Sequence, residues 1–332
     1  MKILVTGGLG FIGFRIVEKL IEQGHEVHAL GRTSVPPPEK RIDGLHYHCH
    51  DLSDSVLSKG WFQGTETVFH VAAKAGVGGR FQEYLHANLT STEKLLAAAK
   101  QAQVKRLIYT STPSVVFSKF PICNGDESLP YSSENFSPYA TTKAWAEKAV
   151  LSANDRSGMQ TVALRPHLVW GAGDPHLLPR VIARHKAGKF KVVGDGKNQV
   201  DLTHVDNVVH AHLCALQAMV SEPSLGGKTY FIGQEEPVCL WEWLNLIFAK
   251  IGLPALEKNM AFKTAYQLGS LIEKVWSTLH LKSDPPMTRF VACQLAQDHW
   301  FSSRAARNDL NYRPILSMDQ AMEKTLPWLQ SL

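Results

Sequence analysis

The sequence predicts an α/β protein with a doubly wound, mainly parallel sheet and a smaller, helix-rich C-terminal domain. Short β-rich runs alternate with long helix-like runs through the first half of the chain. A glycine-rich turn joins the first strand-like run to the first helix-like run. The alternation stops after Trp170, and a helix-rich region with many Trp, Phe and Leu residues ends the chain. Alternating strands and helices favour a parallel sheet covered by helices on both faces.

The composition is that of an ordinary globular protein. The chain has 332 residues, 44% of them hydrophobic and 20% charged, which is enough for about two domains. The net charge of +5 is mild and no long basic run occurs, so we expect no nucleic-acid partner. No apolar stretch reaches the ~18 residues of a membrane span. The five widely spaced cysteines indicate a reduced, cytoplasmic setting.

Periodicity and composition place the individual elements. We predict strands at Lys2–Thr6, Glu26–Leu30, Leu45–Cys49, Thr67–Val71, Arg106–Ser111 and Thr161–His167. We predict helices at Phe11–Gln23, Tyr84–Gln101 and Pro138–Asn154. A helix at Asn207–Met219 and a strand at Lys228–Ile232 are expected to return to the sheet. The first domain would then comprise residues 1–170 with 201–233, and the smaller domain residues 171–200 with 234–332.

Three glycines follow the first predicted strand at regular spacing. Such a turn needs residues without Cβ, and the N-terminus of the next helix offers unpaired N–H groups to an anion. We therefore predict a dinucleotide pyrophosphate site, with a plain strand–turn–helix glycine cluster as the alternative. The expected contacts are Gly7, Gly10, Phe11, Ile12 and Gly13.

The end of the second predicted strand indicates which dinucleotide binds. NAD-specific sites place an acidic residue there for the ribose 2′-hydroxyl. This chain instead has Gly31 and Arg32, and no acidic residue occurs between Glu26 and Glu39. A guanidinium could hold the 2′-phosphate through a charge-assisted bond of about 1.5–3 kcal/mol. We predict NADP(H) rather than NAD(H); a solvated loop arginine is the alternative.

The third predicted strand is rich in histidine. His46, His48 and His50 alternate and so share one face of the strand. A metal site would need further ligands, which no other His or Cys cluster supplies, so we expect no metal and half-exposed strand histidines. Asp51 and Leu52 follow the strand and are expected to reach the adenine.

Tyr139 and Lys143 are four residues apart at the start of a predicted helix, so their side chains share a face. The pKa of a free tyrosine is about 10, and a neighbouring ammonium group lowers it. Tyr139 could then exchange a proton with a substrate oxygen while a hydride moves. We choose Thr112 to orient that oxygen, with Ser111 and Ser114 as alternatives. Strand-end capping would explain the same hydroxyl cluster.

Taken in order, these motifs resemble those of the extended short-chain dehydrogenase/reductases. The matching stretches are Thr6–Gly13, Val68–Ala73, Tyr109–Thr112, Tyr139–Lys143 and Leu164–Pro166. Trp170–Asp174 and Asp201–His212 resemble the 3β-hydroxysteroid dehydrogenase branch. More narrowly, the chain resembles the bacterial 2-alkyl-3-oxoalkanoate reductases of long-chain olefin biosynthesis. That similarity lies in Ala72–Gly76, Tyr109–Val115, Val162–Pro166, Phe262–Tyr266 and Pro285–Phe290.

The resemblance implies a two-domain Rossmann fold with about seven strands in its sheet. It implies Tyr139 as acid/base, Lys143 as the residue that binds ribose and tunes Tyr139, and Thr112 as the holder of the substrate carbonyl. The family more often has Ser at this last position, so the hydroxyl is kept and a methyl group is added. Asn88 matches a family asparagine, although core packing explains it equally well. Further residues expected to border the cofactor are Ala72, Ala73, Pro166 and Val169.

We therefore expect a cytoplasmic, NADPH-dependent reductase that converts a long-chain 2-alkyl-3-oxoalkanoate to the 2-alkyl-3-hydroxyalkanoate. The family implies a homodimer through the helices at Tyr84–Gln101 and Pro138–Asn154, and association with other enzymes of the pathway is a further expectation. The alternatives are an NAD(P)-dependent 3β-hydroxysteroid or sterol-4-carboxylate 3-dehydrogenase, a sugar-nucleotide epimerase, and an NADP-binding sensor or scaffold without catalysis.

The segment Phe262–Leu281 carries a helical apolar stripe. We expect it to be the core helix of the smaller domain. It could instead line a long acyl chain or rest on a membrane surface. The stripe comprises Ala265, Leu268, Ile272, Val275 or Trp276, and Leu279.

Overall fold

The computed structural model describes residues 1–54, 57–133, 137–279, 281 and 283–332. A seven-stranded sheet has the order β12-β7-β5-β4-β1-β2-β3, and all its neighbouring strands are parallel. The strands are β1 (Lys2–Thr6), β2 (Glu26–Gly31), β3 (Leu45–Cys49), β4 (Thr67–His70), β5 (Arg106–Thr110), β7 (Gln160–Pro166) and β12 (Lys228–Ile232). The predicted doubly wound parallel sheet is confirmed. The chain order reverses between β1 and β4. In open sheets of this kind, ligands bind outside the carboxyl ends of the strands at such a point.

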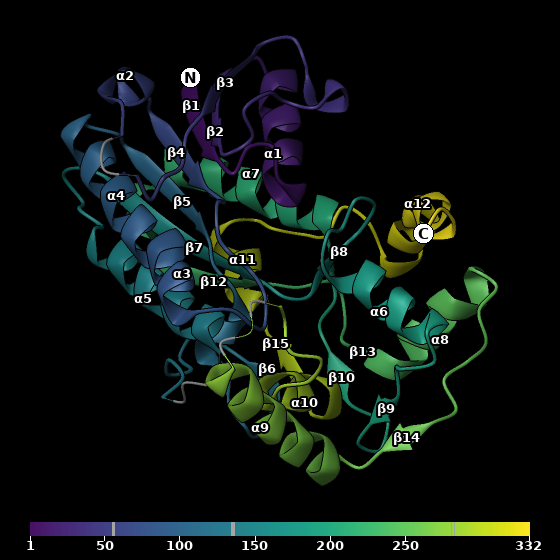
Figure 1. Cartoon of the computed structure of the whole chain (residues 1–332). Helices are drawn as coiled ribbons and strands as arrows, with labels where there is room; N and C mark the ends of the chain where they lie inside the picture. Colours follow the sequence, from purple (N-terminus) through teal and green to yellow (C-terminus); the bar gives the residue numbers. More distant parts are fainter. Residues whose placement is uncertain (55–56, 134–136, 280, 282) are drawn as a thin grey trace.

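Helices cover both faces of this sheet (Figure 1). The helices are α1 (Phe11–Glu22), α2 (Lys59–Phe62), α3 (Phe81–Tyr84), α4 (Ser91–Gln101), α5 (Pro138–Ser152), α6 (Leu177–Lys186), α7 (Val205–Ser221), α8 (Leu240–Lys250), α9 (Phe262–Thr278), α10 (Arg289–Ala296), α11 (Arg304–Asp309) and α12 (Met318–Gln330). Short 3-10 turns are η1 (Pro38–Lys40), η3 (Pro113–Val116) and η4 (Pro223–Leu225).

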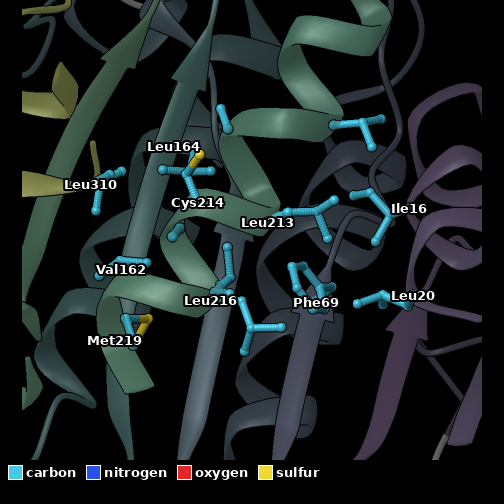
Figure 2. Packing of buried hydrophobic residues seen from close by; sticks show 14 of the residues in the cluster. Ile16, Leu20, Phe69, Val162, Leu164, Leu213, Cys214, Leu216, Met219 and Leu310 are labelled. Carbon is cyan, nitrogen blue, oxygen red and sulfur yellow. The ribbon is translucent and has the colours of Figure 1, made fainter. Parts of the chain in front are cut away.

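Successive residues of a strand point to opposite faces, so a sheet covered on both sides needs continuous apolar runs. In β1, Ile3, Leu4 and Val5 are all fully buried. One core lies between the sheet and helices α1 and α7, and Figure 2 shows side chains of both helices pointing toward the strands. A second core on the other face involves α4 and α5. The burial of both faces explains why alternation of strands and helices was a reliable signal.

The predicted helix Tyr84–Gln101 is not one continuous α-helix. It is divided into the end of α3, a π-helical segment η2 (Leu85–Thr90) and α4. The wider turn contains Asn88, whose side chain bonds to a neighbouring loop and helix as described below. Such bulges are frequent at functional sites, and residue propensity does not reveal them.

A second group of elements has its own core, built around Trp170, Trp241 and Trp243. Its largest sheet has the order β13-β10-β15-β6 and was not predicted from the sequence. The strands are β6 (Ile122–Gly125), β10 (Gln199–Val200), β13 (Val238–Cys239) and β15 (His299–Phe301). Two further strand pairs join β8 (Val169–Trp170) to β11 (Thr203–His204) and β9 (Val192–Val193) to β14 (Asn259–Met260). The domain boundaries proposed above stay a prediction.

The apolar stripe of α9 is not a core stripe, so the expected core helix is wrong. Ala265 is buried, but Leu268, Val275 and Leu279 are exposed. The helix packs on α10 through its other side, where Gly269 lies against the backbone of Thr288. The predicted segment also includes His280, which lies outside the described residues. No helix in the described ranges is long and apolar enough to cross a membrane.

Candidate active site

The glycine turn between β1 and α1 leaves no room for side chains. Gly7 has φ +67°, and a Cβ there would lie 3.0 Å from the backbone of Ala72. A Cβ on Gly13 would collide with the carbonyl oxygen of Gly7. The tight approach of these backbones explains why the turn requires glycine.

The N-terminus of α1 offers the donors that an anion needs. Gly10 provides no side-chain cap, and the first turn contains no acidic residue. The N–H groups of the first turn, including those of Phe11 and Ile12, have no acceptor within the helix. This arrangement fits a pyrophosphate group. Arg15 links the helix to the opposite side of the site, since its guanidinium donates to the carbonyls of Phe11 (2.9 Å) and Ala172 (2.5 Å).

Two cations lie near the end of β2. Arg32 is exposed directly after the strand, as expected. The ammonium of Lys40 donates to the carbonyl of Leu9 in the glycine turn, at 2.5 Å. Lys40 was not predicted, because it follows a proline-rich loop whose path the sequence does not reveal.

Asp51 and Leu52 are less available to a ligand than expected. Asp51 accepts hydrogen bonds from the backbone N–H (2.9 Å) and hydroxyl (2.7 Å) of Ser53. Burial alone would raise the pKa of Asp51, but these bonds and the charge of Arg32 lower it. The Leu52 side chain lies in the core under α4, so it could offer a cofactor only its backbone.

The histidines of β3 pack on one another rather than around a common centre. Nδ1 of His28 and Nε2 of His48 share a hydrogen bond of 2.9 Å. The ring of His46 stacks on that of His28, with the ring centroids 4.7 Å apart. His50 lies against Trp61. Across the described ranges, no group of three or more His, Cys, Asp or Glu side chains is placed to hold a metal ion.

Tyr139 and Thr112 meet at the carboxyl edge of the sheet. Tyr139 stands in the first turn of α5, and Thr112 follows β5. Burial raises the pKa of Tyr139, and a hydrogen bond with Thr112 partly offsets the increase. Thr112 also donates to the hydroxyl of Ser114 and accepts from its backbone N–H, both at 3.2 Å. The Ser111 hydroxyl is buried and has no hydrogen-bond partner among the described residues, so Thr112 is the better placed of the predicted hydroxyls.

Lys143 lies one helical turn beyond Tyr139 and is only 2% exposed. Its ammonium donates to the carbonyl of Thr110 at 2.7 Å and lies 4.0 Å from the ring centre of Tyr109. Burial lowers the pKa of Lys143 to about 7, against an opposing effect of Glu147. Burial and the hydrogen bond with Thr112 account for the shifted pKa of Tyr139, and the expected lowering of that pKa by Lys143 stays a prediction. Lys143 is only partly charged near neutral pH and its ammonium bonds elsewhere.

A fully buried carboxylate lies behind Lys143. Glu147 follows it by one turn of α5 and accepts two hydrogen bonds from Arg165 and one, of 2.8 Å, from the hydroxyl of Tyr131. These residues were missed in the sequence, although the four-residue spacing of Tyr139, Lys143 and Glu147 would have placed all three on one helix face.

A buried polar network connects the cofactor side to the loop after β4. The Ala72 N–H donates to the Thr6 hydroxyl, which bonds to Nδ1 of His70 at 2.7 Å. The other ring nitrogen of His70 bonds to Thr92 at 2.8 Å. Burial lowers the pKa of His70 to about 3, so this ring is neutral. The network holds the carboxyl ends of β1 and β4 together, where Ala73 is exposed.

Asn88 clamps the same loop. Its Oδ1 accepts from the N–H of Lys74 at 2.7 Å, and its Nδ2 donates to the carbonyl of Lys74 (3.1 Å) and the hydroxyl of Thr142 (3.0 Å). Asn88 is therefore buried, as core packing would require, and it also positions the loop after β4 relative to α5. Both explanations given for this asparagine in the sequence agree with the structure.

A cavity of about 630 Å³ opens beside these groups. Thr112, Ser114, Tyr139 and His167 form one side of it. Most of the remaining wall is apolar and comes from α6, α8 and α10. Its charged residues are Arg180 and Asp284, paired at 2.7 Å, and Arg184. The arrangement can hold a large, mostly apolar molecule with its carbonyl at Thr112 and Tyr139.

The segment after β7 lines the cavity through His167 and Leu168. Pro166 is buried at the end of β7, and Val169 begins β8 and is half-buried. Between them, Leu168 has φ +38°, and Nε2 of His167 bonds to Nδ1 of His299 at 2.6 Å. His167 was missed because its partner lies far along the chain.

The sequence profile of the 3-beta hydroxysteroid dehydrogenase/isomerase family matches residues 4–263. The chain belongs to this family. It is an oxidoreductase of the short-chain dehydrogenase/reductase type, as predicted. The similar proteins are named for different substrates. Some are 2-alkyl-3-oxoalkanoate reductases, some are sterol-4-alpha-carboxylate 3-dehydrogenases, and one is a 3-beta-hydroxysteroid dehydrogenase.

A 2-alkyl-3-oxoalkanoate reductase from Stenotrophomonas maltophilia is 42% identical, covering 98% of both chains. One from Shewanella oneidensis is 40% identical, covering 96% of this chain and 84% of the relative. The mouse sterol-4-alpha-carboxylate 3-dehydrogenase, decarboxylating, is 33% identical, covering 98% and 90%. The crystal structure of UDP-glucuronic acid 4-epimerase from Bacillus cereus in complex with NAD superposes with a TM-score of 0.76 at 24% identity, covering 100% and 99%. That last likeness concerns the fold.

Proposed function

We propose that this protein reduces a long-chain 2-alkyl-3-oxoalkanoate to the 2-alkyl-3-hydroxyalkanoate with NADPH, in the biosynthesis of olefins. One observation carries the proposal: the Thr112–Tyr139 pair stands in the wall of a mainly apolar cavity of about 630 Å³. The two bacterial relatives named for this reaction add support, since their similarity extends over nearly the whole chain.

In the proposed reaction, a bound nicotinamide supplies the hydride. Thr112 and Tyr139 hold the substrate carbonyl, and the Tyr139 hydroxyl donates its proton to the oxygen as negative charge develops there. Burial raises the pKa of Tyr139, so proton transfer needs positive charge nearby. Lys143 provides that charge when it is protonated, and Glu147 favours its protonated form.

The choice of NADPH rests on the charges around the glycine turn. Arg32 follows β2 at the position where an acidic residue would favour NAD, and Lys40 adds a second cation bonded to the turn. A phosphate on the ribose 2′-oxygen would be attracted to both. The glycine contacts and the open N-terminus of α1 support the pyrophosphate site. Ala72 and Ala73 would also contact the cofactor, and Pro166 and Val169 would border its nicotinamide.

A sterol-4-carboxylate 3-dehydrogenase is the second candidate, because the mouse relative carries that name. Both candidate reactions interconvert a ketone and an alcohol beside a carboxylate-bearing carbon, so Tyr139 would act alike in both. The shape of the substrate distinguishes them: two flexible alkyl chains in one case and a rigid ring system in the other.

We further propose a cytoplasmic homodimer that associates with other enzymes of the pathway. The five cysteines are all free, as in a reducing compartment. At the surface of α3 and α5, Phe81 and Trp145 are both exposed and their rings meet edge to face at 5.7 Å. Such exposed aromatic residues are frequent in protein–protein interfaces.

A substrate comparison tests the proposal. Oxidation of NADPH is followed by absorbance with a 2-alkyl-3-oxoalkanoate, and reduction of NADP⁺ with a 3β-hydroxysteroid and with a sterol-4-carboxylate. We expect the kcat/KM for the oxo acid to exceed that for either sterol by at least about a hundredfold, on the order of 3 kcal/mol. Faster turnover of a sterol would replace the proposal by the second candidate, and no turnover of any of the three would reject both.

A further inference from the structure

One face of helix α6 forms a wall of the cavity beside Tyr139. Residues three or four positions apart share one side of an α-helix, and the residues of α6 that line the cavity have this spacing: Leu177, Arg180, Val181 and Arg184. The neighbouring side of the helix, with Leu178 and Ile182, is buried in the core around the tryptophans. Asp174 accepts hydrogen bonds from the N–H groups at the start of the helix. The core and this cap together hold the backbone of both arginines in the cavity wall.

The charges in this cavity do not balance. Arg180 forms an ion pair of 2.7 Å with Asp284. Arg184 is half-buried, and within the described part of the chain its guanidinium has no hydrogen-bond or ion-pair partner. Burial lowers the pKa of both His167 and His176, so these cavity histidines are neutral near pH 7. The described residues that line the cavity thus supply two guanidinium groups and one carboxylate, which leaves one positive charge without a partner.

An unpaired guanidinium in a mainly apolar wall favours an anionic ligand. Removing a charge from water costs free energy unless an opposite charge compensates for it. A guanidinium matches a carboxylate especially well, because the two groups form parallel hydrogen bonds. The apolar remainder of the cavity, of about 630 Å³ in all, suits the alkyl part of a long-chain acid.

The end of α6 offers another explanation for the charge of Arg184. Cations are favoured at the C-terminus of a helix, and the last turn of α6 contains Arg184, His185 and Lys186. Lys186 serves that end without lining the cavity, since it is exposed and donates to the carbonyl of Leu332 at 3.1 Å. The two basic residues therefore share the end of the helix but differ in their access to the cavity.

We infer that Arg184, together with Arg180, binds the carboxylate of the substrate, so that the cavity selects a long-chain acid over its ester. The identity of the acid rests on the proposed function. In a 2-alkyl-3-oxoalkanoate the carboxylate is bonded to C2, next to the C3 carbonyl that Tyr139 would hold. Burial raises the pKa of Tyr84 to about 12, and the charges of Arg180 and Tyr139 both act on it. The arginine face of α6 and the reacting carbonyl would thus lie near each other, and a bound monocarboxylate would balance the charges of the cavity.

Binding of an unreactive acid tests the inference without turnover. The probe is a long-chain 2-alkylalkanoic acid, which lacks the 3-oxo group, and its methyl ester is the neutral comparison. Isothermal titration calorimetry measures both ligands on the full chain, with and without NADP⁺. We expect the acid to bind at least about tenfold more tightly than the ester. Arg184→Gln should weaken binding of the acid by about tenfold to a hundredfold, the value of one charge-assisted bond, and that of the ester far less.

Two further variants separate this effect from general damage. Asp284→Asn removes the carboxylate that competes for Arg180, so it should strengthen binding of the acid, whereas damage to the cavity would weaken both ligands. Lys186→Gln is the matched control, because it removes a positive charge from the same turn of α6 outside the cavity. It should bind the acid like the unchanged protein, and thermal unfolding should show that all variants are folded.

Turnover relates the site to the reaction. For the oxo acid, Arg184→Gln should raise KM more than it lowers kcat, because the lost bond is present before the hydride moves. Equal effects on acid and ester, an equal loss in Lys186→Gln, or unchanged binding in Arg184→Gln would overturn the inference. If the unchanged protein reduces no oxo acid but binds the unreactive acid through Arg184, the proposed function fails and the carboxylate site is supported.

Discussion

Glu147 and Arg165 form an ion pair inside the protein, with hydrogen bonds of 3.1 Å from Nε and 2.5 Å from Nη2. Glu147 is fully buried, and its charge opposes the effect of burial on the pKa of Lys143. The pair therefore fixes an anion one helical turn behind the residue that must carry a positive charge in the proposed reaction.

Glu147→Gln should remove the negative charge that favours the protonated form of Lys143. The pKa of Lys143, which is about 7 in the unchanged protein, should then fall further. Since the proposed reaction needs Lys143 protonated, kcat/KM for NADPH should begin to decline at a lower pH than in the unchanged protein. The variant should also lose about 3–5 kcal/mol in free energy of unfolding, because Arg165 is left buried and unpaired. Adding Arg165→Met should restore much of the stability but not the pH profile. An unchanged profile in both variants would show that Glu147 has only a structural role.

Tyr139→Phe tests the proton donor. The variant lacks only the hydroxyl, so we expect kcat to fall by about a thousandfold while NADPH still binds. Stopped-assay turnover and quenching of tryptophan fluorescence measure the two properties separately. Full activity in the variant would reject the mechanism, whereas lost cofactor binding would mean that Tyr139 acts mainly on the ribose.

Thr112 can be replaced by a side chain of nearly the same volume that lacks the hydroxyl. Thr112→Val keeps the shape and removes the hydroxyl, and kcat/KM for the oxo acid should fall by about a hundredfold. Thr112→Ser, which keeps the hydroxyl, should retain most of the activity. If Val and Ser behave alike, the hydroxyl does not hold the carbonyl, and Ser114 becomes the candidate.

Arg32→Ala and Lys40→Ala test the choice of cofactor. Each should weaken NADPH binding by about tenfold to a hundredfold, the value of one charge-assisted bond, and leave NADH binding nearly unchanged. Arg41→Ala is the control, because Arg41 lies in the same loop but its guanidinium donates to the carbonyl of Pro36. An equal loss for NADH and NADPH would contradict a 2′-phosphate site.

Stability should fall in mild acid because buried histidines must stay neutral. Burial lowers the pKa to about 3 for His70 and to about 4 for His212. An unfolded histidine titrates near 6.5, so this stability is fully present above about pH 6.5 and is lost as the pH falls toward 4. Between about pH 7 and 5, each ring should remove on the order of 1–2 kcal/mol from the free energy of unfolding. Urea unfolding at both pH values checks this, and His212→Asn should show a smaller difference than the unchanged protein.

The sheet could be predicted because its signals are local. β1, β3 and β12 have the predicted bounds. β1 and β12 are largely apolar, β-branched or aromatic runs between turn residues. By contrast, β6 pairs with β15, and Ile122 meets His299 far along the chain. Strands of two to four residues with partners at that distance leave no periodic pattern to recognise.

The sequence predicted those site residues whose positions depend on a single helix or on the end of a single strand. Tyr139, Lys143 and Thr112 follow from helical spacing and the end of β5, and the structure brings Tyr139 and Thr112 together. The hydrogen bond from Lys143 to Thr110 and the approach of Lys40 to Leu9 depend on how separate segments pack. The apolar stripe of α9 was visible as a pattern in the sequence, but periodicity does not say whether another element covers it.

The clamp of Asn88 on both backbone groups of Lys74 has a thermodynamic consequence. The loop after β4 is held at one end by a helix that is itself packed against α5. Conformational entropy at that end is therefore lost when the chain folds, not when a ligand arrives. The enzyme meets its substrate preorganised, and affinity in the cavity is not reduced by the need to order this part of its wall.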